Sequence, residues 1–455
     1  MRLDVHVMGR KVASLFRERD EYVLQYDSDA SPGDFVSLAM PVREAPWRWP
    51  RDLHPFFRQN LPEGYLLSLI REQFGPLLDG TDLSLLAVVG AMGIGRVTVT
   101  PEGVRPGAEL QALDIKDILR GDNTADHFAA LVREYARAAI SGAVPKFIAP
   151  GASDTSGTAQ PLVGAVSLGK STIRTSRYIV KGSDENTPFL GFNEFYSMRV
   201  LENAGVMPVA RTQMSDDGRA LVVERFDVDE QGMPVFGVED MCGLLGLPPH
   251  EKYNSTTEKM LNAAKAYLRS RENLRAQFEQ FGWHLLANYV VRNADCHTKN
   301  VALYYSNLDD VAFTPAYDIV TTQAYPRFAA NPPGLPVEGR KTWAPGKTLE
   351  RFNTRMGITP RQYAQMVEAL CDSAVDVGYQ VIEAARNEPQ WRSVAKQMLH
   401  AWNDGMASLR SPKKNVKLQG LSRAIEAAGF SAAQPPAPAR EVIGHSPLLA
   451  KRNQT

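Results

Sequence analysis

The sequence predicts an α+β protein with a strand-rich lobe, a following helical lobe and an extra mixed α/β subdomain at the N-terminus. Alternating strand patterns concentrate before residue 228, whereas long helical stripes dominate after Glu239. A chain of 455 residues exceeds one simple core and indicates two or three structural units. We therefore expect an N-terminal subdomain over residues 1–105, a strand-rich lobe over 106–228, a helical lobe over 229–410 and a flexible tail over 411–455.

The composition indicates a globular protein and gives no sign of a disulfide framework, a broad basic surface or a membrane span. Hydrophobic residues make up 44% and charged residues 22%, as in ordinary soluble globular proteins. Basic and acidic residues balance at 51 each, so no net charge attracts the chain to nucleic acid or to an anionic membrane. The three cysteines are widely spaced, which favours a reducing compartment over a disulfide framework or a zinc site. No apolar run approaches the ~18 residues of a membrane span, so we expect no membrane contact and a cytoplasmic location.

The N-terminal subdomain shows strand patterns and two turns. Residues 2–8 and 22–26 alternate as strands do, and Gly9-Arg10 suits a hairpin turn. Residues 90–95 read Gly-Ala-Met-Gly-Ile-Gly and lead into a strand over 96–100. A phosphate-binding loop should open a helix, so we interpret these glycines as a turn.

The strand-rich lobe combines a sheet with an inserted helix. Residues 128–140 have helical apolar spacing, and 141–148 suit a turn and a strand. The segment 149–170 is rich in Gly, Ser, Thr and Pro, which is typical of an exposed loop. Strands are expected over 176–181 and 220–226, with a helix over 193–204 that Gly205 ends.

The helical lobe begins with a clear amphipathic pattern over 273–292. Short strands are expected over 301–305 and 311–313, and helices over 360–386 and 390–409. The tail contains Lys413, Lys414 and a proline-rich stretch over 433–440, a composition that cannot bury enough apolar surface to order itself.

A polar stretch directly before the strand expected over 301–305 contains the candidate catalytic residues. Phosphoryl transfer needs a carboxylate for the acceptor hydroxyl, with an amide and a second carboxylate for Mg²⁺. The catalytic loop of protein kinases ends in D-x-x-x-x-N, and Asp295-Cys-His-Thr-Lys-Asn300 has this spacing. We therefore predict Asp295 as the catalytic base, and Asn300 and Asp318 as the Mg²⁺ ligands.

The upstream parts of a kinase site follow in the same order. Lys181 ends a strand, as a phosphate-binding lysine should, and Glu194 lies early in the next helix as its candidate ion-pair partner. Glu224-Arg-Phe-Asp227 ends the last strand of the first lobe, where a hinge would meet adenine. We also count His297 and Lys299, inside the catalytic loop, among the ATP-binding candidates.

Each of these residues could have a structural role instead of a role in phosphate transfer. A strand-end lysine is often a solvated edge residue, and Asp318 could be a helix N-cap. Glu194 could face solvent, His297 could only support the loop, and Cys296 could only fill space. The ordered series Lys, Glu, hinge, Asp, Asn, Asp favours a two-lobed, diverged protein-kinase-like fold that uses ATP and Mg²⁺.

These motifs resemble those of the HipA family, the kinase toxins of HipBA-type bacterial toxin–antitoxin modules. The resemblance covers roughly residues 1–410, and its specificity lies in the joint order of the motifs. They are Asn60-Leu-Pro-Glu-Gly64, Ala139-Ile-Ser-Gly-Ala143 with Lys146, Tyr178-Ile-Val-Lys181, Asn193-Glu194, Val223-Glu-Arg-Phe-Asp227, residues 239–248 with Lys252-Tyr253, residues 295–300, and Tyr317-Asp-Ile319.

The resemblance implies a serine/threonine protein kinase that phosphorylates a translation component, such as an aminoacyl-tRNA synthetase. It gives Asp295, Asn300 and Asp318 the roles predicted above, and it implies that Lys181 holds the ATP phosphates. It also implies that Glu224 and Phe226 contact adenine through the backbone, with Asp227 near the ribose.

The same resemblance implies a phosphate-covering loop that contains Ser141, Gly142, Ala143 and Lys146, with Ser141 as an inhibitory autophosphorylation site. The chain departs from the family at Val144-Pro145, where Gln-Glu is common, and proline removes one backbone donor. It also lacks the acidic, double-glycine segment that commonly follows Tyr253.

The resemblance further implies a small helix-turn-helix antitoxin of the HipB type. A chain of zero net charge lacks a broad basic footprint, so we expect it to reach operator DNA only through that partner. Two other functions remain open. A small-molecule kinase of the aminoglycoside or choline type usually has His two residues before the catalytic Asp, where this chain has Asn293. A non-catalytic scaffold with a kinase fold is disfavoured, because all the candidate residues are present.

Overall fold

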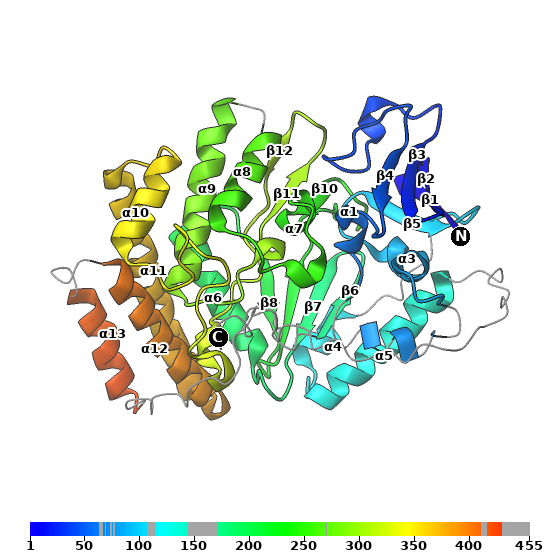
Figure 1. The fold of residues 1–455 in the computed structure, drawn as a ribbon. Coiled ribbons are helices and arrows are strands. Elements are labelled where there is room, and N and C mark those ends of the chain that lie inside the picture. Colours follow the sequence, from blue (N-terminus) through cyan, green and yellow to red (C-terminus); the bar gives the residue numbers. More distant parts are fainter. Residues whose placement is uncertain are drawn as a thin grey trace, which may run out of the picture.

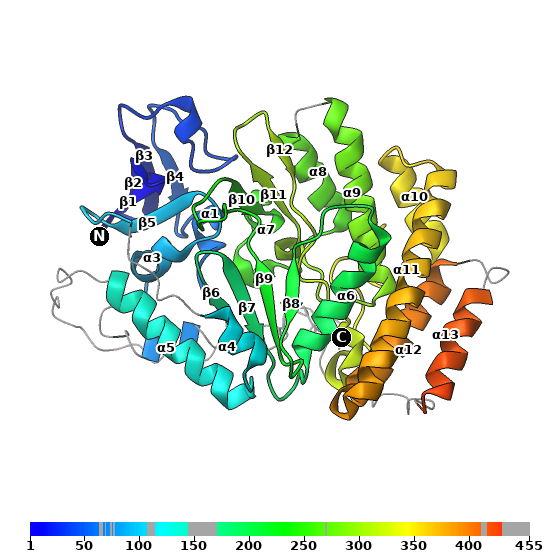
Figure 2. The ribbon, with the colours of Figure 1, turned by 180° about the vertical axis from the view of Figure 1, so that it is seen from behind.

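The computed structural model describes residues 1–455 except 63–66, 69, 73, 74, 76, 77, 107–113, 144–170, 269, 270, 411–415 and 430–455. Two strand-containing parts and a helical part follow one another along the chain (Figure 1). The N-terminal sheet lies at one end, and the last helices lie at the other end in both views (Figures 1 and 2). None of the described helices has both the length and the apolar composition of a membrane span.

The N-terminal part is a five-stranded antiparallel sheet in the order β4-β3-β2-β1-β5. Met8 and Gly9 form a two-residue turn, with φ of 52° and 78°. The predicted hairpin is confirmed, but its turn lies one residue before the predicted Gly9-Arg10, because Arg10 already pairs with Val7. The glycines before β5 open a strand, so the predicted turn is also confirmed. The elements are β1 (Arg2–Val7), β2 (Arg10–Glu18), β3 (Glu21–Tyr26), η1 (Pro32–Asp34), β4 (Trp47–Pro50), α1 (Pro55–Arg58), α3 (Asp82–Val89), η3 (Gly90–Met92) and β5 (Val97–Pro101).

The second sheet has four antiparallel strands in the order β6-β7-β9-β8, with helices packed on both faces. Because side chains alternate along a strand, Val180 and Val222 pack with Phe128 of α5, while Leu221 and Val223 join the core on the α6 side. The elements are α4 (Ile115–Arg120), α5 (Ala125–Ala143), β6 (Ser171–Arg174), β7 (Tyr178–Gly182), α6 (Leu190–Ala204), β8 (Thr212–Met214) and β9 (Ala220–Glu224). Gly205 ends α6 with φ of 63°, as predicted.

The third part is helical around a small sheet in the order β10-β11-β12. The helices of this third part share one hydrophobic core with α6 and with strand β9 of the second sheet. This shared core joins the two lobes. The elements are β10 (Gly237–Asp240), α7 (Met241–Leu244), η4 (Pro249–Glu251), α8 (Thr257–Tyr267), α9 (Arg271–Val290), η5 (Thr298–Asn300), β11 (Ala302–Tyr305), β12 (Val311–Phe313), η6 (Thr322–Ala324), η7 (Pro326–Phe328), α10 (Gly346–Arg355), α11 (Pro360–Asn387), η8 (Pro389–Trp391), α12 (Arg392–Leu409) and α13 (Val416–Ala427).

Two expectations are wrong. The tail after residue 411 is not entirely irregular, because α13 packs against α11 and α12 and buries Leu421 and Ile425, which lie four residues apart on one helix face. The turn and strand expected over 141–148 do not begin at Ser141, because α5 continues through Ala143, and residues 144–148 lie outside the described residues. A single glycine costs a helix only about 1 kcal/mol, so Gly142 does not end it. The expected loop over 149–170 lies outside the described residues.

Candidate active site

Lys181 joins two carboxylates that are far apart in the sequence. Strand β7 carries the lysine and α6 carries Glu194, and Lys181 Nζ forms an ion pair with Glu194 Oε1. The same ammonium lies 2.8 Å from Asp318 Oδ1. The side chain of Glu194 is only 1% exposed, so its charge requires this partner. Glu194 is therefore not a solvent-facing residue, and Lys181 is not a solvated edge lysine.

Asp318 lies after β12 in the left-handed region, with φ of 59°. A non-glycine residue with positive φ is uncommon and often marks a functional segment. Asn300 Nδ2 donates a hydrogen bond to Asp318 Oδ2, and the hydroxyl of Tyr317 donates to the carbonyl of Lys299 at 2.9 Å. These two bonds hold the segment around Asp318 against the loop that carries Asn300.

The predicted catalytic loop lies between α9 and β11, and side chains fix its backbone. The Asp295 N–H donates to Asn293 Oδ1 at 3.0 Å, and the Ala294 N–H donates to Thr322 Oγ1 at 2.7 Å. Gly334 contacts the loop from behind, since a Cβ added there would lie 2.3 Å from the Cys296 carbonyl oxygen. Asp295 therefore lies on a loop that is held from both sides.

The Asp295 carboxylate is buried in this structure. The residue is 6% exposed, and its Oδ1 accepts a hydrogen bond from the hydroxyl of Tyr253, which is 7% exposed. His297 Nε2 lies 4.0 Å from the same oxygen. Tyr253 is a site residue that the sequence analysis missed as such. Only the Lys252-Tyr253 motif pointed to it, because local patterning does not reveal a contact across 42 residues.

His297 and Cys296 have structural roles within the loop. His297 Nδ1 accepts from the Lys299 N–H at 3.3 Å, and the His297 N–H donates to Asn300 Oδ1 at 3.2 Å, so this histidine caps η5. Burial raises the pKa of the Cys296 thiol to about 12, which keeps it protonated. The space-filling alternative therefore fits Cys296.

The hinge candidates differ in what they can contact. The Glu224 carboxylate lies 3.8 Å from Arg177 and 3.7 Å from Arg211, and the ring of Phe226 packs near that of Tyr317. Asp227 is 1% exposed, and its carboxylate accepts hydrogen bonds from Arg225 and from the Gly95 N–H at 2.7 Å. Its side chain therefore ties the hinge to the N-terminal subdomain, and in this structure it is not available to a ribose as the resemblance implied.

A second contact fastens the N-terminal subdomain beside the hinge. The Glu239 carboxylate is buried and accepts from Ser37 Oγ at 2.7 Å, from the Leu38 N–H at 2.6 Å and from the hydroxyl of Tyr305 at 2.8 Å. Burial outweighs these bonds and raises the pKa of Glu239 to about 7. The N-terminal subdomain thus forms hydrogen bonds both with the hinge, at Asp227, and with β10, at Glu239.

Part of the predicted phosphate loop cannot be placed against these groups. The backbone of Ser141, Gly142 and Ala143 forms the end of α5, and Lys146 lies outside the described residues. The structure therefore brings together Lys181, Glu194, Asn300 and Asp318, and it places Asp295 on the same loop as Asn300.

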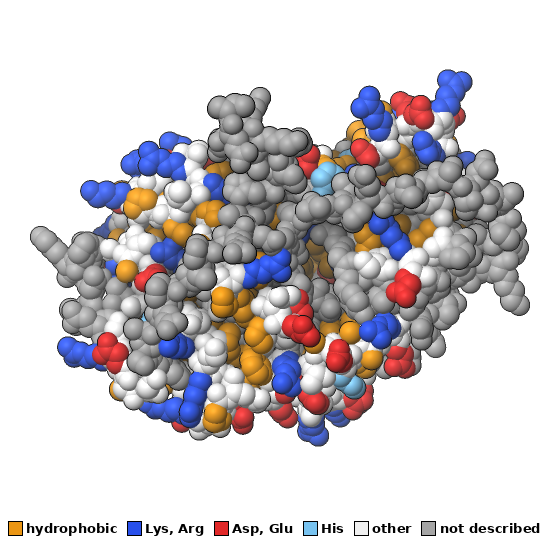
Figure 3. Space-filling model, turned by 60° about the horizontal axis from the view of Figure 1, so that its bottom comes forward, with side chains coloured by type: hydrophobic (Ala, Val, Ile, Leu, Met, Phe, Trp, Pro, Cys, Tyr) orange, Lys and Arg blue, Asp and Glu red, His pale blue; other side chains and the backbone are white. Residues whose placement is uncertain are grey.

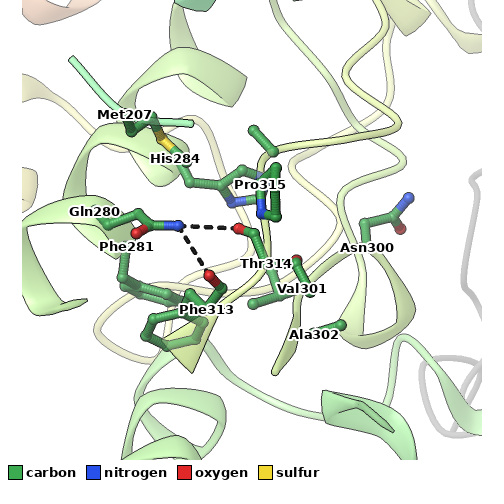
Figure 4. A pocket seen from close by; sticks show the side chains of 11 residues that line it. Met207, Gln280, Phe281, His284, Asn300, Val301, Ala302, Phe313, Thr314 and Pro315 are labelled. Atoms are coloured by element: carbon green, nitrogen blue, oxygen red, sulfur yellow. Dashed lines mark hydrogen bonds between the residues drawn. The ribbon is translucent and has the colours of Figure 1, made fainter. Parts of the chain in front are cut away.

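Two small cavities lie behind the catalytic loop. Figure 4 shows the first, where Gln280 Nε2 donates to the carbonyls of Phe313 at 3.2 Å and Thr314 at 2.9 Å, and Asn300 lies on the opposite side. The second is lined by Asn293, Cys296 and Gly334, among others, and His284 lines both. Burial lowers the pKa of His284 to about 4, so this histidine is neutral and not a ready acid. These cavities lie beside the loop residues and not between Lys181 and the hinge, so we do not assign the nucleotide to them.

The donor set suits Mg²⁺ better than a metal held wholly by protein. Asn300 and Asp318 offer amide and carboxylate oxygens, and Mg²⁺ commonly takes one or two carboxylates and completes its shell with phosphate oxygens and water. Within the described part of the chain, no group of three or more His, Cys, Asp or Glu side chains could hold a metal. The candidate residues therefore fit a metal that arrives with a nucleotide.

Curated relatives are described as kinases. "Putative kinase" of Haemophilus influenzae is 30% identical over 199 residues, which are 40% of this chain and 55% of that protein, so the match spans about half of the relative. "Putative kinase Y4mE" of Sinorhizobium fredii is 29% identical over 309 residues, which are 64% of this chain and 69% of that protein.

The fold is similar to that of a solved toxin–antitoxin structure, and the sequence matches two family models. The HipA chain from the Shewanella oneidensis MR-1 complex of HipA, HipB and operator DNA has a TM-score of 0.56 at 18% identity, covering 94% of this chain and 96% of that one. This similarity confirms the predicted two-lobed, kinase-like α+β fold with an N-terminal subdomain. The HipA N-terminal domain model matches residues 3–100, and the HipA-like C-terminal domain model matches residues 138–377. Because the second match alone spans more than half of the 455 residues, the protein belongs to the HipA family.

Proposed function

We propose that the protein is a serine/threonine protein kinase that transfers the γ-phosphate of ATP to a protein substrate. The observation that carries the proposal is the ammonium of Lys181 between Glu194 and Asp318, with Asn300 on Asp318 and Asp295 on the adjoining loop. A phosphoryl-transfer site needs this combination of a fixed cation, a metal-binding carboxylate and amide, and a separate carboxylate for the acceptor.

Each residue has a defined task in this proposal. Asp295 orients the acceptor hydroxyl and takes its proton as the new oxygen–phosphorus bond forms. Lys181 holds phosphate oxygens, and Glu194 fixes the position of the ammonium. Asn300 and Asp318 would hold Mg²⁺, which neutralises charge on the phosphates when it is bound. The backbone of the hinge at Glu224 and Phe226 would receive adenine.

Other predicted residues have supporting parts. We propose that Ser141, Gly142, Ala143 and Lys146 cover the phosphates and that phosphorylation of Ser141 inhibits the enzyme. Lys299 would add positive charge near the phosphates. His297 would support the loop rather than bind ATP directly, given the hydrogen bonds by which it caps η5.

The cellular role we propose is that of a cytoplasmic toxin restrained by a helix-turn-helix antitoxin of the HipB type. The HipA chain with a similar fold was solved in a complex with HipB and its operator DNA. On the face seen in Figure 3, the described Lys and Arg side chains are scattered and interrupted by Asp and Glu side chains. The equal totals of 51 basic and 51 acidic residues support DNA contact through the antitoxin and not by this chain alone. The substrate would be a translation component, as the resemblance implies.

Binding of Mg-ATP is the first test. A ligand that binds only the native state raises the melting temperature, so Mg-ATP at millimolar concentration should stabilise the wild-type protein. Lys181→Met and Asp318→Asn should each reduce that shift. The absence of any shift in the wild type would contradict the proposal. Labelled ATP then separates a protein acceptor from a small metabolite by whether radioactivity appears in protein.

A further inference from the structure

We infer that Tyr253 occupies the place of the acceptor hydroxyl at Asp295, so that an acceptor must displace the phenol before phosphate transfer. The inference rests on the proposed function, because it assigns Asp295 as the catalytic base. It names a residue of this chain that controls access to that base.

The contact has the geometry of a substrate mimic. A phosphate acceptor presents a hydroxyl that donates its hydrogen bond to the catalytic carboxylate, and the Tyr253 hydroxyl donates in this way to Asp295 Oδ1. With Asp295 only 6% exposed, another hydroxyl cannot reach that oxygen while the phenol remains. The structure therefore represents a state in which the base is covered.

The backbone on both sides of Tyr253 is fixed. The carbonyl of Lys252 accepts from Thr298 Oγ1 at 2.8 Å and from the Thr298 N–H at 3.2 Å. The Thr257 N–H donates to the carbonyl of Pro336 at 3.1 Å. In our inference, an acceptor reaches Asp295 after the Tyr253 side chain rotates away, while these hydrogen bonds keep the backbone beside the catalytic loop in place.

Two ammonium groups hold the phenol ring in its covering position. Lys341 Nζ lies 5.6 Å and Lys252 Nζ lies 5.7 Å from the centre of the Tyr253 ring, within the range of cation–π attraction. The ring of His297 packs edge-on against it, with centroids 4.9 Å apart. Lys341 approaches from a segment distant in sequence, so its substitution offers a way to loosen the ring without replacing either Tyr253 or Asp295.

The strength of the hydrogen bond from Tyr253 to Asp295 determines how much faster ATP hydrolysis should become when that bond is removed. A hydrogen bond to a charged group contributes about 1.5–3 kcal/mol, which corresponds to roughly 10- to 100-fold in rate. In Tyr253→Phe, we expect a water molecule to take the place of the phenolic oxygen and to donate to Asp295 in the same way. That water can attack the γ-phosphorus: its oxygen forms the new bond, the bond to the bridging oxygen breaks, ADP leaves, and the water proton passes to Asp295.

The experiment measures ATP hydrolysis without an added acceptor in the full-length protein. Tyr253→Phe should hydrolyse ATP about 10-fold or more faster than the wild type, with a similar Kd for Mg-ATP. Lys341→Met, which keeps the hydroxyl but weakens the hold on the ring, should change the rate in the same direction and by less. Tyr363→Phe is the matched control, because it removes a buried hydroxyl that donates to Gly346 at 2.9 Å on the far helix α11 and should leave hydrolysis unchanged.

The outcomes separate this inference from the proposed function. An unchanged or slower Tyr253→Phe enzyme that still binds Mg-ATP would overturn the inference, and slower hydrolysis would show that Tyr253 positions the base. A wild-type protein that does not bind Mg-ATP would instead overturn the proposed function. Faster hydrolysis by Tyr253→Phe together with an unchanged Tyr363→Phe would support the inference.

Discussion

Gly334 offers a test of how closely the catalytic loop must be positioned. A Cβ at residue 334 would lie 2.3 Å from the carbonyl oxygen of Cys296 and 3.1 Å from that of Ala294. Ordinary carbon–oxygen contacts lie at about 3.3–3.6 Å, so Gly334→Ala must displace one of the two segments by about 1 Å. A displacement of that size beside the chemistry costs on the order of 10²-fold in rate.

We expect Gly334→Ala to lower kcat for phosphate transfer about 100-fold while Mg-ATP still raises the melting temperature. The overpacked site should also lose about 1–3 kcal/mol of stability. Gly420→Ala is the matched control, because its added Cβ would meet only the Tyr379 hydroxyl, at 3.6 Å, and its activity should equal that of the wild type. A folded Gly334→Ala enzyme with a normal kcat would refute the argument that this glycine positions the loop.

Three further outcomes are expected. The pKa of Glu239 is raised in the folded state from 4.5 to about 7, so the free energy of unfolding should fall by about 3 kcal/mol as pH rises through that window. Glu239→Gln should remove that dependence in denaturation experiments, and an identical pH profile for both proteins would contradict the assignment. Lys181→Met removes the ammonium that pairs with the buried Glu194 carboxylate, so the free energy of unfolding should drop by about 3–5 kcal/mol. Adding Glu194→Gln should recover most of that loss. No recovery in the double variant would argue against the ion pair. Incubation with Mg-ATP should place a phosphate on Ser141, and its absence by mass spectrometry in an active enzyme would remove the proposed regulation.

The sequence allowed much of the fold to be predicted, because its signals are local. The helical spacing of apolar residues in α9, the glycine that ends α6 and the turn at Gly9 each depend on residues a few positions apart, although residues 281–290 of α9 are buried on every side and not along one stripe. The two errors have the same origin. Two apolar residues in α13 were outweighed by the proline-rich stretch beyond them, and a single serine–glycine pair was taken to end α5.

The candidate site divides in a similar way. The spacing within residues 295–300 and the order of Lys181, Glu194 and Asp318 were sufficient to predict which residues come together. The contacts of Tyr253 with Asp295 and of Gly95 with Asp227 join segments 42 and 132 residues apart. No short pattern encodes such pairs, so the covered base and the buried hinge aspartate could be found only from the structure.

Phosphate transfer by Asp295→Asn tests the central claim most directly. The substitution keeps the shape of the side chain and removes the group that accepts the hydroxyl proton. With labelled ATP and Mg²⁺, transfer to protein should fall by on the order of 10²-fold or more, while the stabilisation by Mg-ATP remains. Near-normal transfer by Asp295→Asn would contradict the assignment of Asp295 as the catalytic base, and with it the proposed mechanism.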